Sequence, residues 1–238
     1  MLRRLLPNFA VSAESYGDDS NNVALLYPEE AAAVAGSVEK RRREFATVRA
    51  CARSAMMALG IPPQSVVPGQ RGAPRWPEGV VGSMTHCEGY RAVALARAGD
   101  LASLGIDAEP HSPLPDGVLD LVSLSTEQGN LKLLAEADPY VHWDRLLFSA
   151  KEAVYKAWFP LTQEWLDFGQ VDIKISRDRC VVPSGRFRAR LLVPGPVVGG
   201  QVRDHFDGQW AVQHGLVFCA VAVPASEPAA HPLPGPEA

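Results

Sequence analysis

Two pairs of charged residues in this chain stand at spacings that suit phosphate chemistry. Asp107 and Glu109 lie two residues apart in a strand-like segment, where alternate side chains share a face. Glu152 and Lys156 form an i,i+4 pair in residues 148–156, which have helical spacing. Mg²⁺ takes carboxylate oxygens together with the oxygens of a substrate phosphate. These acids therefore suit an open magnesium site, although their spacing alone equally fits solvated surface charges.

A long helix rich in arginine is expected over residues 37–59. The segment contains neither proline nor glycine and stops at residues 60–63, Gly-Ile-Pro-Pro. Its apolar residues recur at steps of three and four and form a core face: Phe45, Val48, Ala52, Met56 and Leu59. Arg42, Arg49 and Arg53 follow a neighbouring stripe, with Arg41 turned about a quarter circle away from Arg42. Guanidinium groups suit bidentate phosphate binding, although the run at residues 41–43 equally fits a solvated basic face.

A threonine and a histidine, Thr85 and His86, follow a strand-like segment at a corner of the chain. A lone histidine is more often structural than functional. A hydroxyl and a ring nitrogen can nevertheless both donate hydrogen bonds to phosphate oxygens.

Four blocks in fixed order resemble the 4′-phosphopantetheinyl transferases of the surfactin and enterobactin type, in an actinobacterial-like branch. The blocks are the arginine helix near residues 41–53, Gly-x-Pro with Ser-x-Thr-His in residues 72–90, Gly-Ile-Asp-x-Glu at 105–109, and Trp-Asp-x₄-Phe-Ser-x-Lys-Glu-Ala-x-x-Lys at 143–156. They span about residues 40–170. Arg71 and Arg75 flank the Gly-x-Pro turn, where Arg75-Trp76 departs from the family pattern, and Phe148 stands where many members have tryptophan.

The resemblance implies transfer of the phosphopantetheine arm of coenzyme A to a serine of an apo acyl or peptidyl carrier protein, with release of adenosine 3′,5′-bisphosphate. Asp107, Glu109 and Glu152 would hold Mg²⁺, with Mn²⁺ as the alternative ion, and Lys156 would contact phosphate. Glu152, or a metal-bound water, would take the serine proton, with Glu127 as the rival base. The residues implied to contact the coenzyme are Arg41, Arg49, Arg53, Thr85, His86, Lys151 and Lys156. Lys151 could instead point to solvent.

The fold expected from the resemblance is α+β, a pseudodimer of two similar halves with the active site in the cleft between them. Residues 110–115 contain three prolines and mark the linker, which gives halves at 1–110 and 111–223 and a disordered tail at 224–238. Helices are expected at residues 28–35, 118–137 and 140–158, the last ended by Phe159-Pro160. Strands are expected at residues 171–175 and 187–193, with hairpins joining 90–96 to 101–108 and 209–213 to 216–223.

The composition of the chain limits the classes of function that it can have. At 238 residues with 47% hydrophobic side chains, the chain can bury a substantial core. A formal net charge of −4 argues against bulk nucleic-acid binding, and no segment reaches the length of a membrane span. Four cysteines without Cys-x-x-Cys spacing, and a basic start without an apolar stretch, favour a cytoplasmic protein. We expect it to be a monomer. A metal-dependent phosphohydrolase, or a non-catalytic coenzyme A or carrier-binding protein, remains the alternative.

Overall fold

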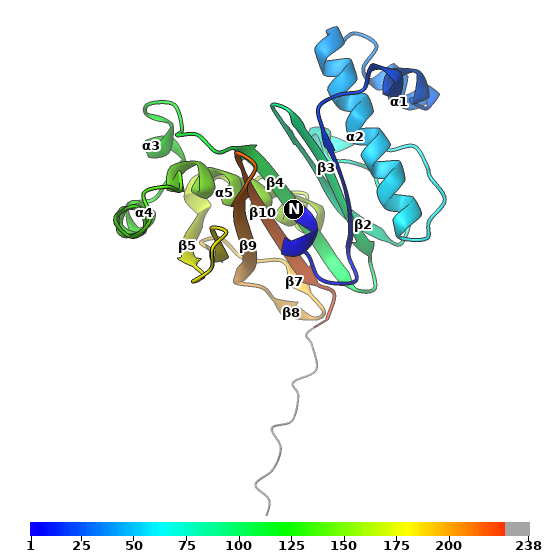
Figure 1. Cartoon of the computed structure of the whole chain (residues 1–238). Coiled ribbons are helices and arrows are strands. Elements are labelled where there is room, and N and C mark those ends of the chain that lie inside the picture. Colours follow the sequence, from blue (N-terminus) through cyan, green and yellow to red (C-terminus); the bar gives the residue numbers. More distant parts are fainter. Residues whose placement is uncertain (227–238) are drawn as a thin grey trace, which may run out of the picture.

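Antiparallel sheets with helices packed on them make up the computed structural model, which describes residues 1–226 (Figure 1). Within those residues the strands form a smaller sheet in the order β1-β3-β2, a larger sheet in the order β4-β10-β9-β6-β5, and a separate pair, β7-β8. The smaller sheet consists of β1 (Val11–Tyr16), β2 (Val80–Cys87) and β3 (Tyr90–Arg97). The larger sheet consists of β4 (Leu101–Pro110), β5 (Val171–Arg177), β6 (Ser184–Leu191), β9 (His205–Gln213) and β10 (Leu216–Pro224), and the pair is β7 (Val197–Val198) and β8 (Gln201–Val202). The expected α+β class is confirmed.

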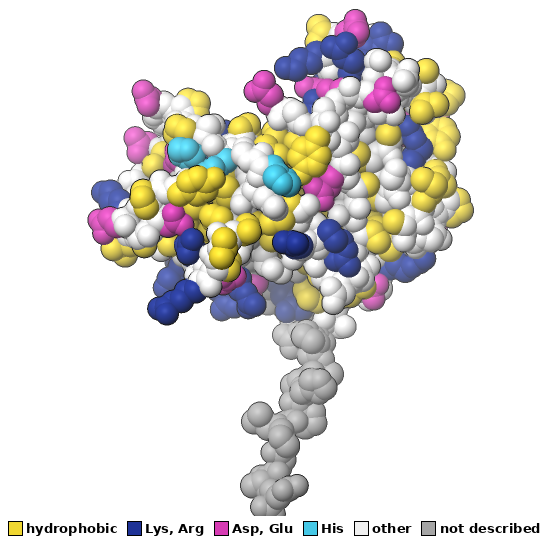
Figure 2. All heavy atoms as spheres, viewed as in Figure 1, with side chains coloured by type: hydrophobic (Ala, Val, Ile, Leu, Met, Phe, Trp, Pro, Cys, Tyr) yellow, Lys and Arg dark blue, Asp and Glu magenta, His cyan; other side chains and the backbone are white. Residues whose placement is uncertain are grey.

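A long helix covers one face of each sheet. The α-helices are α1 (Pro28–Ala33), α2 (Glu39–Ala58), α3 (Val118–Val122), α4 (Ser125–Ala137) and α5 (Trp143–Thr162), and the 3₁₀ turns are Leu2–Leu5, Ser20–Leu25, Gln70–Gly72 and Phe168–Gln170. Figure 1 shows α2 beside β2 and β3 at one end of the molecule, with α3, α4 and α5 toward the other end. The space-filling outline is notched between these two ends (Figure 2). The sequence prediction of a long arginine-bearing helix agrees with α2.

Strand β3 is buried on both faces and joins the two sheets. Val93 and Leu95 pack against α2, whereas Tyr90 and the alternate alanines of β3 pack against β4 and β10. Because neither face meets water, β3 is a nearly continuous apolar run rather than an alternating one. The core between the sheets also takes in Leu104, Ile106 and Ala108, as predicted, and this leaves the opposite face of β4 for its acids.

The predicted hairpin between residues 90–96 and 101–108 is wrong. β3 pairs with β1 and β2, whereas β4 pairs with β10, so the chain crosses from one sheet to the other between β3 and β4. Side-chain hydroxyls of β2 bind the free edge of β4: the amide of Ile106 donates to Ser83 Oγ at 3.0 Å, and the amide of Ala108 donates to Thr85 Oγ1 at 3.2 Å. These contacts satisfy edge amides that a paired strand would otherwise bind.

Two of the expected helices differ from the structure by more than two residues. The helix expected over residues 118–137 is broken, because Ser123 and Leu124 are extended, and Glu127 accepts a hydrogen bond from the Leu124 amide at 2.7 Å to start α4. Helix α5 begins at Trp143 instead of residue 140 and continues through Pro160 to Thr162, where Gln163 caps it with a φ of +59°. A proline in the last turn removes one backbone donor without preventing the turn from closing.

Several of the remaining strands differ from the sequence expectation. β6 runs from Ser184 to Leu191 instead of residues 187–193, β9 begins at His205 instead of residue 209, and β7 and β8 were not expected. Thr85 and His86 lie within β2 and not at a corner that follows it. Strand β1 was not expected, since its residues are only partly buried and show no sharp alternation. The hairpin of β9 and β10 is confirmed, with His214 and Gly215 both at positive φ, as a two-residue turn between twisted strands requires.

The predicted boundary between the two halves, at residue 110, lies at the end of β4. Strand β4 falls in the predicted N-terminal half but completes the larger sheet by pairing with β10, and the boundary at residue 110 stays a prediction. Of the predicted tail, Pro224 ends β10, and residues 227–238 lie outside the described part of the chain. Among the described residues, no helix is both long enough and apolar enough to cross a bilayer.

Candidate active site

Strand β4 and helix α5 face each other in register, and their pairing positions the acids of the site. The facing pairs, from one end to the other, are Ser103 with Ala157, Gly105 with Ala153, Asp107 with Ser149, and Glu109 with Arg145. Two residues advance a strand by about 6.6 Å and four residues advance a helix by about 6 Å, so the two repeats match. Gly105 allows the close approach, because a Cβ there would overlap the backbone carbonyl of Ala153.

Asp107 is buried and its carboxylate is held from both elements. Its Oδ1 accepts hydrogen bonds from Thr85 Oγ1 at 3.1 Å and from Lys156 Nζ at 2.6 Å, and its Oδ2 accepts one from Ser149 Oγ at 2.8 Å. A buried charge is tolerated only when such donors surround it. The orientation of Asp107 is therefore fixed by β2 and α5 together.

Glu109 pairs with Arg145, whose guanidinium also donates to the carbonyls of Ser112 and Pro113. The Arg145 to Glu109 hydrogen bond measures 3.1 Å. Burial, and then the neighbouring charge of Asp107, raise the pKa of Glu109, while Arg145 opposes that shift. Arg145 thus connects this carboxylate to the proline-rich segment that follows β4.

Glu152 and Lys156 extend from α5 into a cavity that lies between α5 and α2. In the described part of the chain, Lys156 bonds to Asp107 on β4 rather than to Glu152, the partner that the i,i+4 spacing suggested. Burial raises the pKa of Glu152, Lys156 lowers it, and Asp107 adds to the upward shift. A carboxylate whose pKa is raised toward neutrality is better suited to accept and return a proton.

Arg49 lies on the other wall, buried within α2. Its Nε donates to the Val66 carbonyl at 2.8 Å, one terminal nitrogen lies 3.4 Å from Met84 Sδ, and the guanidinium stacks 3.6 Å from the Phe45 ring centroid. Burial lowers the pKa of Arg49 to about 10, so the side chain keeps its charge at neutral pH. These contacts hold a cation at the cavity with few rotamers left to lose on binding an anion.

Arg41 and His86 meet at the same wall. A terminal nitrogen of Arg41 lies 2.8 Å from His86 Nε2. Partial burial, followed by the Arg41 charge, lowers the pKa of His86. Both side chains line the cavity. Each was expected separately to contact the coenzyme, and that role stays a prediction.

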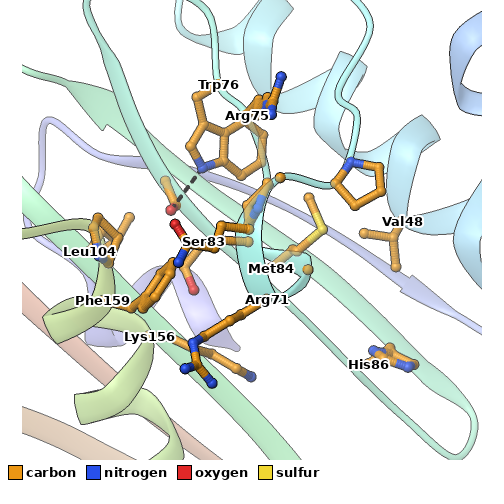
Figure 3. A pocket seen from close by; sticks show the side chains of 18 of the residues that line it. Val48, Arg71, Arg75, Trp76, Ser83, Met84, His86, Leu104, Lys156 and Phe159 are labelled. Carbon is orange, nitrogen blue, oxygen red and sulfur yellow. Dashed lines mark hydrogen bonds between the residues drawn. The ribbon is translucent and has the colours of Figure 1, made fainter. Parts of the chain in front are cut away.

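A cavity of about 770 Å³ is lined by Arg41, Arg49, His86, Glu152 and Lys156 (Figure 3). Asp107 and Glu109 lie off this lining, and Asp107 is linked to it through Lys156. The cavity opens between α2, β2, α5 and the loop at residues 68–76. Figure 3 shows Arg71 and Lys156 reaching into it, with Trp76 held by a hydrogen bond from Nε1 to the Gly82 carbonyl at 2.9 Å. Among the described lining residues the charged side chains are Glu152 and, on the basic side, Arg41, Arg49, Arg71, Arg75 and Lys156. The lining therefore favours a polyanionic ligand, although the chain as a whole is acidic.

Three of the predicted coenzyme contacts lie off the cavity lining. Arg53 donates to Glu30 at 3.1 Å, and its guanidinium lies 5.5 Å from the ring centroid of Tyr27. Lys151 is buried and pairs with Glu127 at 2.8 Å. Thr85 donates to Asp107 Oδ1, the oxygen that Lys156 also binds, so its contact is with the carboxylate and not with the cavity.

The rival base Glu127 is enclosed by donors. Besides Lys151, its carboxylate accepts hydrogen bonds from the Leu124 amide at 2.7 Å and the Ile173 amide at 2.7 Å. It does not line the cavity. This arrangement fits a buried connection between α4, α5 and β5 better than a proton acceptor.

The donor chemistry of Asp107, Glu109 and Glu152 fits a hard cation, because each side chain offers carboxylate oxygens. Across residues 1–226, however, no three carboxylate, histidine or cysteine groups already converge on one point. Asp107 nevertheless acts electrostatically on both glutamates. Magnesium commonly takes one or two carboxylates and completes its shell with water and substrate phosphate oxygens. The residues therefore fit an ion whose shell is completed by phosphate, and the set of three stays a prediction.

Some residues of the site were not assigned from the sequence. Arg71 and Arg75 line the cavity, and Arg71 adopts a positive φ of 53° with its guanidinium 5.4 Å from the Trp165 ring centroid. Ser149 and Arg145 hold the two strand acids. The signal that could have found Ser149 and Arg145 is the match between the two-residue repeat of β4 and the four-residue repeat of α5.

Comparison with known proteins identifies the family. Residues 29–96 match the model of the 4′-phosphopantetheinyl transferase N-terminal domain, and residues 103–212 match the model of the 4′-phosphopantetheinyl transferase superfamily. The chain is 58% identical over 226 residues to the 4′-phosphopantetheinyl transferase Svp of Streptomyces mobaraensis, covering 94% of this chain and 90% of the relative. It is 47% identical over 211 residues to PptT of Mycobacterium tuberculosis, covering 89% and 91%, and 48% identical over 227 residues to Npt of Nocardia iowensis, covering 93% and 99%. The chain belongs to the 4′-phosphopantetheinyl transferase superfamily.

Proposed function

We propose that this transferase moves the 4′-phosphopantetheine arm of coenzyme A onto a serine hydroxyl of an apo acyl or peptidyl carrier protein, in a magnesium-dependent reaction. The observation that carries the proposal is the basic cavity that ends at the Lys156 and Asp107 ion pair. Coenzyme A presents two clusters of phosphate charge on one elongated molecule, and the cavity has cations on two walls. The names of the relatives support the same chemistry.

Arg41, Arg49 and His86 on the α2 side would bind phosphate oxygens of the coenzyme. Guanidinium groups present parallel donors to such oxygens, and Arg49 is already oriented by its contacts with Val66 and Phe45. Arg71 would add a further cation near Lys156. Arg53 takes no part in this proposal, because it pairs with Glu30.

Asp107, Glu109 and Glu152 would hold Mg²⁺. When bound, the ion supplies positive charge that offsets the negative charge of the pyrophosphate oxygens during transfer. Thr85 and Ser149 keep the Asp107 carboxylate in one orientation, and Arg145 does the same for Glu109. The order of these contacts along β4 keeps the two acids on the face that meets α5.

Glu152 is the proposed proton acceptor for the carrier serine, because it lines the cavity and its pKa is raised by burial. The serine oxygen attacks the phosphorus next to the pantetheine arm as its proton passes to Glu152. The bond from that phosphorus to the bridging oxygen breaks, and adenosine 3′,5′-bisphosphate leaves with the electron pair. Lys156 donates a hydrogen bond to a phosphate oxygen throughout and compensates the charge of the leaving group.

Mass spectrometry of a carrier protein tests the proposal. The purified chain is incubated with coenzyme A, Mg²⁺ and an apo carrier, and a gain of about 340 Da on the carrier serine is expected, the mass of the phosphopantetheine group. Asp107→Asn should abolish the gain, whereas Asp172→Asn, which alters an exposed ion pair with Arg190, should leave it intact. No mass gain with several carriers, together with phosphate release from small esters, would favour a hydrolase instead.

A further inference from the structure

A series of interacting charged side chains extends from His86 away from the cavity. Arg41 lies 2.8 Å from His86 Nε2 and 3.7 Å from a carboxylate oxygen of Glu44. The other carboxylate oxygen of Glu44 lies 3.4 Å from Arg91, which in turn bonds to Asp18 at 2.7 Å. Arg91 is buried and also donates to the carbonyls of Cys87 and Tyr90. This series of charged side chains is therefore held rigidly at Arg91.

The β2–β3 hairpin and α2 bring these groups together. His86 and Arg91 are direct cross-strand partners, so their side chains leave the same face of the smaller sheet. That face is covered by α2, where Arg41 and Glu44 stand three residues apart on neighbouring turns. Each ion pair in this series thus joins two separate segments or two turns of α2.

The contact between Arg41 and His86 defines the state of the imidazole. A guanidinium has donors and no acceptor, so Arg41 must donate, and His86 Nε2 must accept through its lone pair. The ring is then neutral, and its single proton lies on Nδ1. This leaves Nδ1–H as the only ring donor with which His86 can bind a phosphate oxygen.

We propose that Glu44 is a positioning residue, which Arg91 holds in place and which orients Arg41 so that His86 is fixed as its Nδ1–H tautomer. The inference deepens the proposed coenzyme A site and rests on that function. Glu44 does not line the cavity, so its contribution is to the geometry of the two groups that do. A preorganised donor loses less freedom on binding than a free ring does.

The direction of the His86 pKa supports the neutral ring. Partial burial and the charges of Arg41, Lys156 and Arg91 lower it, and Glu44 opposes them. These groups come from α2, α5 and β3, the elements that face the ring. Neutral His86 beside Arg41 also avoids placing two cations in direct contact before an anion is bound.

Nitrogen-15 NMR of the histidine rings tests the assignment in the ligand-free protein, with His86 identified by the signals missing from His86→Gln. The wild-type chain should show a protonated Nδ1 and an unprotonated Nε2. Glu44→Gln should lose this pattern in favour of averaged or Nε2-protonated signals. It should also raise KM for coenzyme A about three- to fivefold, with kcat within about twofold, as expected for loss of a partly exposed ion pair.

Glu39→Gln is the matched control, because Glu39 pairs with Arg43 at 2.9 Å on the same helix and takes no part in the series of ion pairs that leads to His86. It should leave both the ring pattern and KM unchanged. Arg41→Lys provides a second test if Glu44→Gln folds poorly, and it should weaken the same ring pattern. A wild-type ring protonated on Nε2, or a Glu44→Gln spectrum identical to that of wild type, would overturn the inference. Failure of the wild type to bind coenzyme A in calorimetry would instead count against the proposed function, since the tautomer is measured without ligand.

Discussion

Lys156 Nζ lies 2.6 Å from Asp107 Oδ1, in an ion pair whose two side chains differ in exposure, at 27% for Lys156 and 5% for Asp107. The carboxylate is fixed by Thr85 and Ser149, whereas the ammonium reaches it from the cavity side. Lysine has three donors, so Nζ can keep Asp107 and still bind a phosphate oxygen. The pair therefore links the buried end of the site to whatever anion fills the cavity.

Lys156→Met should slow transfer about a hundredfold or more, because it removes a cation that the transition state needs. It should also lower the free energy of unfolding by about 1–3 kcal/mol, since Asp107 loses a donor while staying buried. The transfer rate is read from the mass gain of a carrier protein, and stability from urea denaturation. Lys174→Met, at an exposed position of β5, is the control and should change neither. A Lys156→Met rate within threefold of wild type would place the phosphate contact elsewhere.

Gly105→Ala should destabilise the chain by about 1–3 kcal/mol, because the new methyl group would overlap the backbone of Ala153 and force α5 away from β4. Transfer should fall as well, since Asp107 and Ser149 would lose their register. Gly129→Ala is the opposite case, as no atom lies within 4 Å of its added Cβ and the residue is in α4. It should stabilise by about 0.5–1 kcal/mol. Equal denaturation midpoints for the two variants would refute the close contact of β4 and α5.

Glu127→Gln distinguishes a structural carboxylate from a catalytic one. Both side chains of the Lys151 and Glu127 pair are buried, and removing one charge from such a pair costs about 3–5 kcal/mol. We expect that loss in urea denaturation, together with a kcat within about fivefold of wild type when measured below the unfolding transition. Glu127→Gln combined with Lys151→Met should recover part of the stability, because no unpaired charge remains. A kcat reduced a hundredfold in the folded variant would restore Glu127 as the base.

Residues that act within one element were predictable from the sequence. The face of β4 that carries Asp107 and Glu109, and the arginine stripe of α2, follow from the periods of strands and helices. Contacts between elements were harder to foresee. Two apolar segments on either side of Gly99-Asp100 look like a hairpin, and only the packing of β3 between α2 and the larger sheet separates the two strands.

The same distinction applies to the candidate site. Lys151 and Glu152 are neighbours on one helix, yet the turn of about 100° between them sends Lys151 to Glu127 and Glu152 to the cavity. Arg53 shares a stripe with Arg49, but Arg53 donates to Glu30 of α1, whereas Arg49 donates to the Val66 carbonyl and stays at the cavity. Which charges meet depends on elements far apart in the sequence. Spacing alone therefore could not choose among them.

Stability of the ligand-free chain should depend on pH through His86. The pKa of His86 is lowered in the folded state by burial and then by Arg41, so below about pH 6.5 the unfolded chain binds a proton that the folded ring resists. Folding is therefore favoured above the unfolded pKa, and stability is lost as the pH falls through that value toward the lower folded pKa. We expect the free energy of unfolding to drop between pH 7 and pH 5.5, and to drop less in His86→Gln.

Arg41→Gln gives a second reading of the same effect. Removing the guanidinium removes one of the charges that lower the pKa of His86, so the pH dependence should shrink although the histidine is still present. The pKa of His111 is also lowered by burial, so His111 adds a loss of stability at low pH in every variant. The informative quantity is therefore the difference in pH dependence between the variants and wild type. Urea denaturation at a series of pH values measures it. Parallel pH profiles for wild type, His86→Gln and Arg41→Gln would show that His86 is not held neutral by its surroundings.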